Sequence, residues 1–147
     1  MNEIKIKLPS KEEIFKRGIK IHTAGENQSW EKSQLEEYAG CSGVYIFYSD
    51  KKFMYCGKTT TGKWGTFAER IRRHCQFSSA QNSKVYQALA ASKHDIFVSM
   101  FKCDEIEKFI HLGLIEFKAV KHKTERCCLL FEQGLIAFLD TLELNIK

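Results

Sequence analysis

Alternating apolar and charged side chains open the chain. Over residues 2–8, isoleucine and leucine alternate with lysine, and this period of two predicts an edge strand. Residues 10–13, Ser-Lys-Glu-Glu, have the pattern of a capping box and predict a short helix that runs to about Ile19. Residues 1–40 carry no recognisable chemistry, so we interpret them as an N-terminal extension that covers a sheet edge or helps to grip a substrate.

Two runs rich in aromatic and β-branched residues follow, at positions 43–48 and 52–57. Three polar residues, 49–51, separate them, so the two runs predict a β-hairpin. In a hairpin with so short a turn, Tyr45 and Tyr55 can approach each other across the ladder.

The middle of the chain predicts a helix whose charged residues flank an apolar stripe. Residues 66–69, Thr-Phe-Ala-Glu, form a second capping box, and the helix is expected to run to about Gln76. The apolar residues that recur along it are Phe67, Ile71 and Cys75. Arg70 and His74 are also four residues apart, and they flank that stripe.

The second half of the chain predicts further helices and one more strand. We expect a helix around residues 83–91, a strand at 96–101 and a long helix at 123–140. Residues 104–120 fit either one long helix or a helix followed by a strand.

At 147 residues, the chain has the length of one compact domain that buries about two thirds of its unfolded surface. Hydrophobic residues at 44% and charged residues at 28% are typical of an ordinary soluble protein. No run of about eighteen apolar residues predicts a membrane span, and the N-terminus lacks a signal-peptide pattern. We therefore expect a cytoplasmic protein without a membrane partner.

The six cysteines are scattered and include no Cys-x-x-Cys pair. In a reducing compartment they are expected to act as small apolar residues. A structural zinc site needs four ligands at close, paired spacing, so we do not expect one.

Positive charge is concentrated in one segment. The net charge is +5, but residues 51–75 alone carry +6, so the rest of the chain carries −1. The basic residues of this segment are Lys51, Lys52, Lys58, Lys63, Arg70, Arg72 and Arg73. Such a concentration attracts a polyanion such as nucleic acid, although a solvated face of a mildly basic protein has the same composition.

Glu132 is the most informative single position. Its helical neighbours, three and four residues away, are Cys128, Leu129, Leu135 and Ile136. All are apolar, so the carboxylate is expected on the buried stripe, where it must be paired, hydrogen-bonded or metal-bound. An internal ion pair with Arg70 would satisfy it. One Mg²⁺ or Mn²⁺ ion, which keeps several waters and borrows a phosphate oxygen, would do so too. No second acid matches it, so a two-metal centre is not expected.

Arginine and tyrosine supply the other candidate chemistry. The planar guanidinium of Arg70 suits a phosphate oxygen on which charge grows, whereas Arg72 and Arg73 point elsewhere on the helix. A tyrosine hydroxyl has a pKa of about 10, so Tyr45 needs help to act as a base. It must pass its own proton on, or nearby positive charge must lower its pKa. Taken singly, Arg70 fits an ordinary helix-edge cation better than a catalytic group, and Tyr45 and Tyr55 fit ordinary strand aromatics better.

The order and spacing of these residues resemble the GIY-YIG nuclease family. Gly43-Val44-Tyr45 and Tyr55-Cys56-Gly57 stand in the places of its two tripeptides, and the arginine helix and the glutamate helix follow in the same order. The resemblance implies an α+β fold, in which a central antiparallel three-stranded sheet, a hairpin plus a third strand, is flanked by helices. The core would span residues 41–147, with residues 1–40 as the N-terminal extension.

Family roles carry over position by position. The resemblance implies that Tyr45 takes a proton from the attacking water, with Tyr55 and Lys58 assisting. Arg70 would stabilise the pentavalent phosphate, and His74 would relay a proton from Tyr45.

The resemblance also implies a metal site and a DNA-binding surface. Glu132 would bind one Mg²⁺ or Mn²⁺ ion, and Asn145 would orient the site, although Asn145 could equally be an ordinary residue of the C-terminal loop. The candidate phosphate-binding residues are Lys58, Lys63, Arg72 and Arg73.

These features together favour a divalent-metal-dependent endonuclease that hydrolyses DNA phosphodiesters. Lys58, the long loop before Arg70 and the Arg70/His74 pair are similar to restriction endonucleases of the family, and a homing or phage-borne nuclease is the neighbouring alternative. So small a protein is expected to form a homodimer in order to cut both strands. The competing hypothesis is a module that binds nucleic acid without cleaving it.

Overall fold

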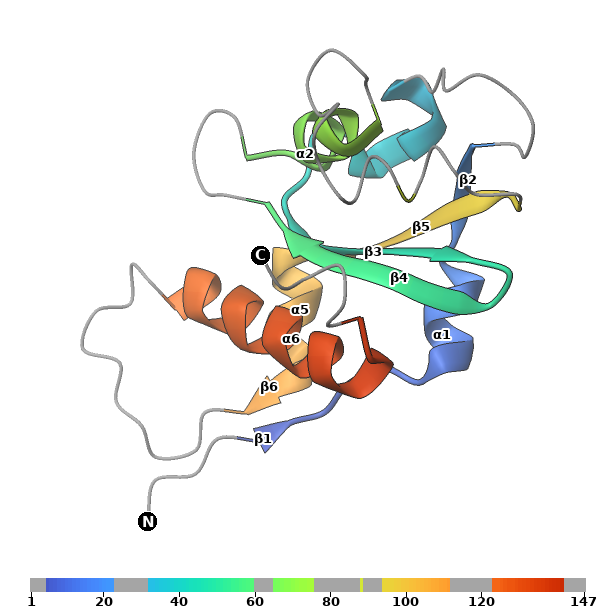
Figure 1. Ribbon diagram of the computed structural model, residues 1–147. Coiled ribbons are helices and arrows are strands. Elements are labelled where there is room, and N and C mark those ends of the chain that lie inside the picture. The colour runs from blue at the N-terminus through green and yellow to red at the C-terminus, as the bar shows by residue number, and fades with distance from the viewer. Residues whose placement is uncertain are drawn as a thin grey trace.

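The computed structural model describes residues 5–22, 32–59, 65–75, 88, 94–111 and 123–141. Its centre is a four-stranded antiparallel sheet of order β2-β5-β3-β4, with helices on both faces (Figure 1). The strands are β2 (Ile19–His22), β3 (Gly43–Ser49), β4 (Lys52–Lys58) and β5 (Ile96–Lys102). The fold is therefore α+β, as the sequence predicts, but the sheet has four strands where the sequence predicted three.

The additional strand comes from the N-terminal extension. The predicted helix begins as expected, because the Ser10 hydroxyl accepts the backbone N–H of Glu13 at 3.1 Å. However, α1 (Lys11–Lys16) ends before Ile19, the predicted end of this helix. Gly18 is a poor helix former, and the four residues after it alternate isoleucine with basic side chains, which favours a strand. This strand, β2, pairs antiparallel with β5, so the extension covers the β5 edge of the sheet.

The other predicted elements agree with the structure where it describes them. The edge strand predicted at residues 2–8 is β1 (Lys5–Ile6), but it pairs with β6 (Ile110–His111) in a separate two-stranded sheet. Because α5 (Cys103–Phe109) precedes β6, the ambiguous segment is a helix followed by a strand up to His111. The helix predicted around residues 83–91 lies outside the described residues, apart from Ala88.

The hairpin of β3 and β4 is confirmed, and its turn has the backbone that a tight connection requires. Asp50 and Lys51 both have positive φ, at 50° and 59°, as the central residues of a type I′ turn do. In the resulting register Tyr45 pairs with Gly57 and Phe47 pairs with Tyr55.

Strand β3 lies in the middle of the protein and contributes to two cores. Val44 and Ile46 face a core built with α1, α5 and α6 (Lys123–Leu139). Tyr45 and Phe47 face the opposite core, with α2 (Phe67–Cys75) and η1 (Lys32–Tyr38), a 3-10 helix. In Figure 1, α2 and α6 lie on opposite faces of the sheet. Within the described residues, no helix has both the length and the apolar character that a membrane crossing requires.

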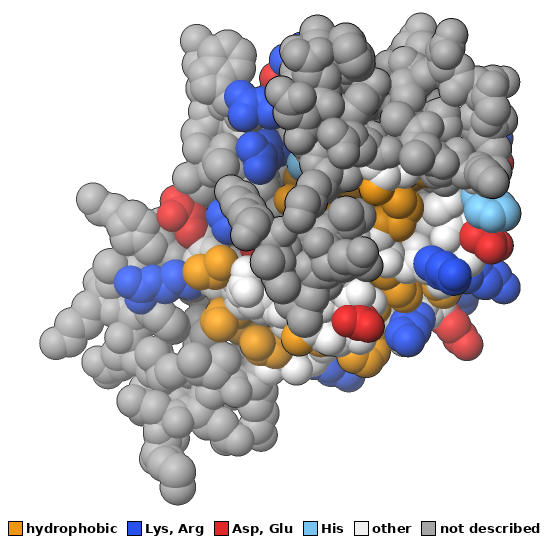
Figure 2. Space-filling view, in the orientation of Figure 1, with side chains coloured by type: hydrophobic (Ala, Val, Ile, Leu, Met, Phe, Trp, Pro, Cys, Tyr) orange, Lys and Arg blue, Asp and Glu red, His pale blue; other side chains and the backbone are white. Residues whose placement is uncertain are grey.

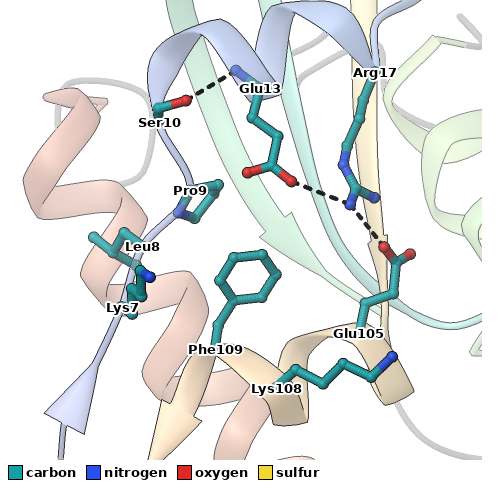
Figure 3. Close-up of a pocket in the computed structure, with 9 residues that line it drawn as sticks. All are labelled: Lys7, Leu8, Pro9, Ser10, Glu13, Arg17, Glu105, Lys108 and Phe109. Carbon is teal, nitrogen blue, oxygen red and sulfur yellow. Dashed lines mark hydrogen bonds and ion pairs between the residues drawn. The ribbon is translucent and has the colours of Figure 1, made fainter.

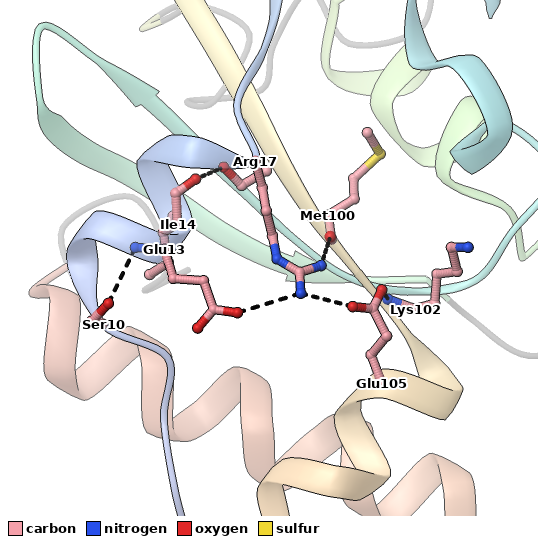
Figure 4. Close-up of polar contacts among 8 residues, drawn as sticks. Ser10, Glu13, Ile14, Arg17, Met100, Lys102 and Glu105 are labelled. Carbon is pink, nitrogen blue, oxygen red and sulfur yellow. Dashed lines mark hydrogen bonds and ion pairs between the residues drawn. The ribbon is translucent and has the colours of Figure 1, made fainter.

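Arg17 fastens the extension to the core. Its guanidinium pairs with Glu105 on α5 at 2.7 Å and with Glu13 at 3.4 Å (Figure 4). It also donates to the carbonyl oxygen of Met100 at 3.3 Å and lies 4.2 Å from the ring centroid of Phe101. Burial alone would lower the pKa of Arg17, but the hydrogen bond and charge of Glu105 outweigh it, so the pKa is raised.

A cavity of about 600 Å³ opens between the β1–α1 segment and α5. As Figure 3 shows, Pro9 and Phe109 line it, together with Arg17 and its two ion-pair partners, Glu13 and Glu105. Lys7 and Lys108 line it as well. None of the predicted site residues that the structure describes lines this cavity.

Candidate active site

Tyr45 lies at the centre of the candidate site, and Gly57 makes room for it. A Cβ atom on Gly57 would lie 2.4 Å from both Cζ and the hydroxyl oxygen of Tyr45. The phenol therefore lies directly over the glycine backbone of β4, a position that no residue with a side chain would leave free. The expected approach of the two tyrosines is observed, since the ring centroids of Tyr45 and Tyr55 are 6.3 Å apart.

His74, from the last turn of α2, meets the Tyr45 hydroxyl. Its Nε2 atom lies 2.8 Å from the phenol oxygen, within hydrogen-bond distance. Three aromatic rings surround the imidazole, with centroid distances of 5.8 Å to Tyr45, 5.6 Å to Phe47 and 5.1 Å to Tyr55. Burial, helped by the charge of Arg70, lowers the pKa of His74 to about 4. The imidazole is therefore neutral at neutral pH, and in the tautomer that carries its proton on Nδ1 it can accept a proton at Nε2.

The environment of Tyr45 favours proton transfer over a permanent phenolate. Burial raises the pKa of Tyr45, and Tyr55 raises it further. The charge of Arg70 and a hydrogen bond from it lower the pKa only in part. Of the two routes that the sequence left open for Tyr45, the protein surroundings thus favour the first, in which the phenol passes its proton on as it accepts another.

Arg70 reaches the site from the first half of α2. Thr66 caps this helix by accepting the backbone N–H of Glu69 at 3.3 Å, and the predicted apolar residues Phe67 and Ile71 are fully buried. These contacts fix the helix so that Arg70 lies half-buried beside Tyr45. The Nε–H of Arg70 is buried, and it has no hydrogen-bond partner in the described part of the chain. A buried donor of this kind is costly unless a ligand or a further group accepts its hydrogen bond.

Glu132 approaches from α6, on the other face of the sheet. Cys128, Leu135 and Ile136 are buried as predicted, but Leu129 is 46% exposed, so Glu132 lies at the margin of the apolar stripe. Three of the four apolar neighbours are thus buried, and the buried stripe is narrower than the spacing suggested because it leaves out Leu129.

The charge of Glu132 interacts with the tyrosine side of the site. It raises the pKa of both Tyr45 and Tyr55, so the carboxylate lies close enough to act on the phenols. Burial raises the pKa of Glu132 itself, and the charges of Lys58 and Arg70 lower it only in part. Among the ion pairs of the described residues there is none between Glu132 and Arg70, so the internal ion pair is not observed. Groups from both faces of the sheet thus act on the same two phenols.

Comparison with known families bears on this arrangement. Residues 41–112 match the family model of the GIY-YIG catalytic domain. Through this segment the chain belongs to the GIY-YIG family. The match contains Tyr45, Tyr55, Arg70 and His74, whereas Glu132 lies beyond its end. Searches of curated proteins and of solved structures found no match.

Membership of the GIY-YIG family places the chain in a superfamily of nucleases, for which DNA is the implied substrate. The nucleases of this family generally depend on a divalent metal. The described residues contain no group of three or more histidine, cysteine, aspartate or glutamate side chains that could hold a metal ion. A single carboxylate is nevertheless sufficient for magnesium, because this ion keeps most of its waters. Glu132 fits that role, since it is half-buried, its charge is only partly compensated, and the Gln133 amide donates to it at 3.3 Å.

The predicted phosphate-binding residues differ in position. Lys58, at the end of β4, is half-buried and its charge acts on Glu132. Arg72 and Arg73 are exposed on α2, and Arg72 pairs with Glu69 at 3.0 Å. Figure 2 shows basic side chains on the α2 side of the molecule. Lys63 and Asn145 lie outside the described residues.

Two residues that sequence reasoning missed support the GIY-YIG site. Phe47 packs edge-on against the imidazole of His74, and its signal was its place two residues after Tyr45, on the same face of the strand. Thr59 closes the open end of the hairpin: its Oγ1 accepts the N–H of Gly43 at 3.0 Å, and its own N–H donates to the Gly43 carbonyl at 2.9 Å. No periodic pattern marks Thr59, because its role depends on the register of the two strands.

Proposed function

We propose that the protein is a divalent-metal-dependent DNA endonuclease. The observation that carries this proposal is the 2.8 Å contact between the Tyr45 hydroxyl and Nε2 of His74, next to Arg70. A buried phenol, a neutral imidazole and a guanidinium whose buried Nε–H lacks an acceptor among the described residues can together assist phosphodiester hydrolysis by water.

The proton pathway follows from these contacts. As a water oxygen forms a bond to phosphorus, one water proton moves to the Tyr45 hydroxyl oxygen, and the Tyr45 proton moves to Nε2 of His74. The bond from phosphorus to the leaving oxygen breaks on the opposite side. Tyr45 is neutral before and after the step, which suits a phenol whose pKa burial has raised.

Arg70, and a metal ion held by Glu132, would stabilise the negative charge of the reacting phosphate. The guanidinium of Arg70 donates to a non-bridging phosphate oxygen, where negative charge grows during attack. Glu132 would hold one Mg²⁺ or Mn²⁺ ion, with Asn145 helping to orient the site. When bound, this ion supplies positive charge that offsets the charge of the phosphate. Lys58 keeps a second positive charge close to the same carboxylate.

The remaining basic residues position the DNA. Arg72 and Arg73 contact phosphates next to the cleaved one, and Lys63, which precedes α2 in the sequence, is a further phosphate-binding residue. A restriction-type or mobile-element role in the cytoplasm accords with Lys58 and the Arg70/His74 pair. Residues 41–147 act as the nuclease core and residues 1–40 as its extension. Cutting of both strands requires a homodimer, and a monomer nicks.

A plasmid cleavage assay with Mg²⁺ or Mn²⁺ tests the function. We expect Glu132→Gln and Arg70→Ala to reduce cleavage of supercoiled plasmid at least about a hundredfold. Glu125→Gln changes the same residue type in the first turn of α6, and we expect it to cleave like the wild type. Unchanged cleavage by both site variants would remove the proposed mechanism. Wild-type protein that retards DNA in a gel but leaves it intact with either metal would instead identify a binding module.

A further inference from the structure

Two thiols outside the proposed catalytic machinery lie next to each other. The sulfur of Cys103, the first residue of α5, is 3.6 Å from the sulfur of Cys128 on α6. Both cysteines are free thiols. Cys103 is partly exposed, whereas Cys128 is buried, with 6% of its surface accessible. An oxidant can therefore reach one member of the pair and not the other.

The hydrogen bond between the thiols makes their chemistry unequal. Either sulfur can donate in this hydrogen bond, and the contact lowers the pKa of Cys103. The same bond, together with burial, raises the pKa of Cys128, and the charge of Lys58 offsets this only in part. Since the thiolate is the nucleophile, Cys103 is the attacking residue and Cys128 the resolving one.

We propose that Cys103 and Cys128 form a peroxide-reactive dithiol that closes to an intrachain disulfide and slows cleavage at the neighbouring site. The Cys103 thiolate attacks a hydroperoxide, which breaks the O–O bond, leaves a sulfenic acid on Cys103 and releases water or an alcohol once protonated. The Cys128 sulfur then bonds to the Cys103 sulfur, and the sulfenic hydroxyl leaves with the Cys128 proton as water. One hydroperoxide is reduced for each disulfide that forms. A thiol reductant reverses the change.

The effect on cleavage rests on the function proposed above, and it follows from the position of Cys128. Bonded sulfurs lie about 2.05 Å apart, so the pair must close by about 1.5 Å. Cys128 lies one helical turn before Glu132 on α6, and the charge of Lys58 acts on both side chains. A displacement of about 1 Å at a catalytic centre can cost about a hundredfold in rate, so even a partial shift of α6 slows cleavage.

Peptide mapping by mass spectrometry after hydrogen peroxide treatment of the whole protein tests the bridge. We expect a linked Cys103–Cys128 peptide that disappears on reduction and does not form in Cys103→Ser or in Cys128→Ala. Cys41 is also partly exposed, but its thiol donates to the Glu37 carbonyl at 3.4 Å. Cys41→Ser is therefore the matched control, and it should still form the linked peptide.

The cleavage assay tests the consequence. We expect oxidised wild-type protein to cleave at least about tenfold more slowly than reduced protein, and Cys103→Ser to be insensitive to peroxide. Both residues remaining open to alkylation after peroxide treatment, or Cys103 ending as a sulfonic acid beside a free Cys128, would overturn the bridge. A bridge that forms without changing the cleavage rate would overturn the regulatory effect. Reduced protein that never cleaves disproves the proposed nuclease function instead, while the peptide map still decides on the bridge.

Discussion

The position of the Tyr45 hydroxyl depends on an atom that Gly57 lacks. The phenol occupies the space that a Cβ atom of residue 57 would fill, so its ring lies over β4. Its hydroxyl is then within hydrogen-bond distance of Nε2 of His74. The rings of Phe47 and Tyr55 then hold the imidazole from two further sides. A change of one side chain at Gly57 must therefore displace the residue that we propose as the base.

Gly57→Ala tests this contact against a glycine that has free space. We expect the substitution to lower the free energy of unfolding by about 1–3 kcal/mol, because the added methyl group overlaps the Tyr45 ring. Cleavage should fall about a hundredfold, because the phenol moves. Urea unfolding and the plasmid assay measure the two effects.

Gly40→Ala is the control, because a Cβ there meets no atom within 4 Å. It should stay within about 0.5 kcal/mol of the wild type. Equal stability of the two variants would contradict the close packing of Tyr45 on Gly57.

The neutral state of His74 leads to a pH dependence of stability. The unfolded chain binds a proton on His74 below its ordinary pKa of 6.5, whereas the folded protein binds it only near a pKa of about 4. Between these pH values the unfolded state holds more protons, so the free energy of unfolding falls as the pH falls, by at most about 3 kcal/mol. His74→Phe keeps a ring of similar size and removes this loss.

Urea unfolding of both proteins at about pH 7 and about pH 5 measures the difference. The raised pKa of Glu132 stabilises the folded state as the pH falls, which is the opposite sign, but it is present in both proteins. The change in the free energy of unfolding with pH therefore differs between the wild type and His74→Phe only through the histidine. An equal change in the two proteins would show that the fold does not keep His74 neutral.

Among the helices and strands, those with a complete local pattern could be predicted from the sequence. The hairpin at 43–57 and the helices α2 and α6 each have a full period and a turn or cap, and they appear where expected. Strand β2 was missed because it has four residues and directly follows a helix, so too few positions repeat. The segment after residue 104 was ambiguous, because short apolar runs fit a helix or a strand equally well.

The site was predictable only in part, because it depends on contacts between distant residues. Tyr45 lies on strand β3 and faces α2, whereas Glu132 lies on α6 at the opposite face, and no local pattern reports that the charge of Glu132 acts on the Tyr45 phenol. Their place in the order of a known family supplied that information. The close approach at Gly57 and the pair of thiols depend on register and helix packing, which a single sequence does not encode locally.

The link between α1 and α5 gives a prediction about the N-terminal extension. Glu105 contacts Arg17 at 2.7 Å with 26% of its side chain exposed, whereas Glu13 contacts the same guanidinium at 3.4 Å with 42% exposed. Glu105→Gln should lower the free energy of unfolding by about 1–2 kcal/mol, and Glu13→Gln by less than about 0.5 kcal/mol. Urea unfolding compares them, and equal losses would mean that Arg17 does not tie the extension to α5.

At the scale of the whole molecule, the exposed Arg72 and Arg73 lie on α2, and α1 lies on the other face of the sheet (Figure 1). If DNA lies along α2, Arg72→Gln and Arg73→Gln should each reduce the salt dependence of DNA binding by about 0.9 in the slope of log K against log salt. Lys16→Gln, an exposed lysine on α1, should leave the slope unchanged. Fluorescence anisotropy at several salt concentrations measures the slopes, and an equal effect of Lys16 would place the DNA elsewhere.

In the described sheet, β4 and β2 are the two end strands, and each has a hydrogen-bonded neighbour on one side only. An uncovered strand is a template for the strand of another molecule, so self-association through β4 would compete with substrate bound at the neighbouring Tyr45. Bound nucleic acid would then slow the aggregation of the protein. Concentrated solutions of the protein should stay clear longest when they contain a short DNA duplex. The molecules that aggregate first should be those without bound DNA to cover β4.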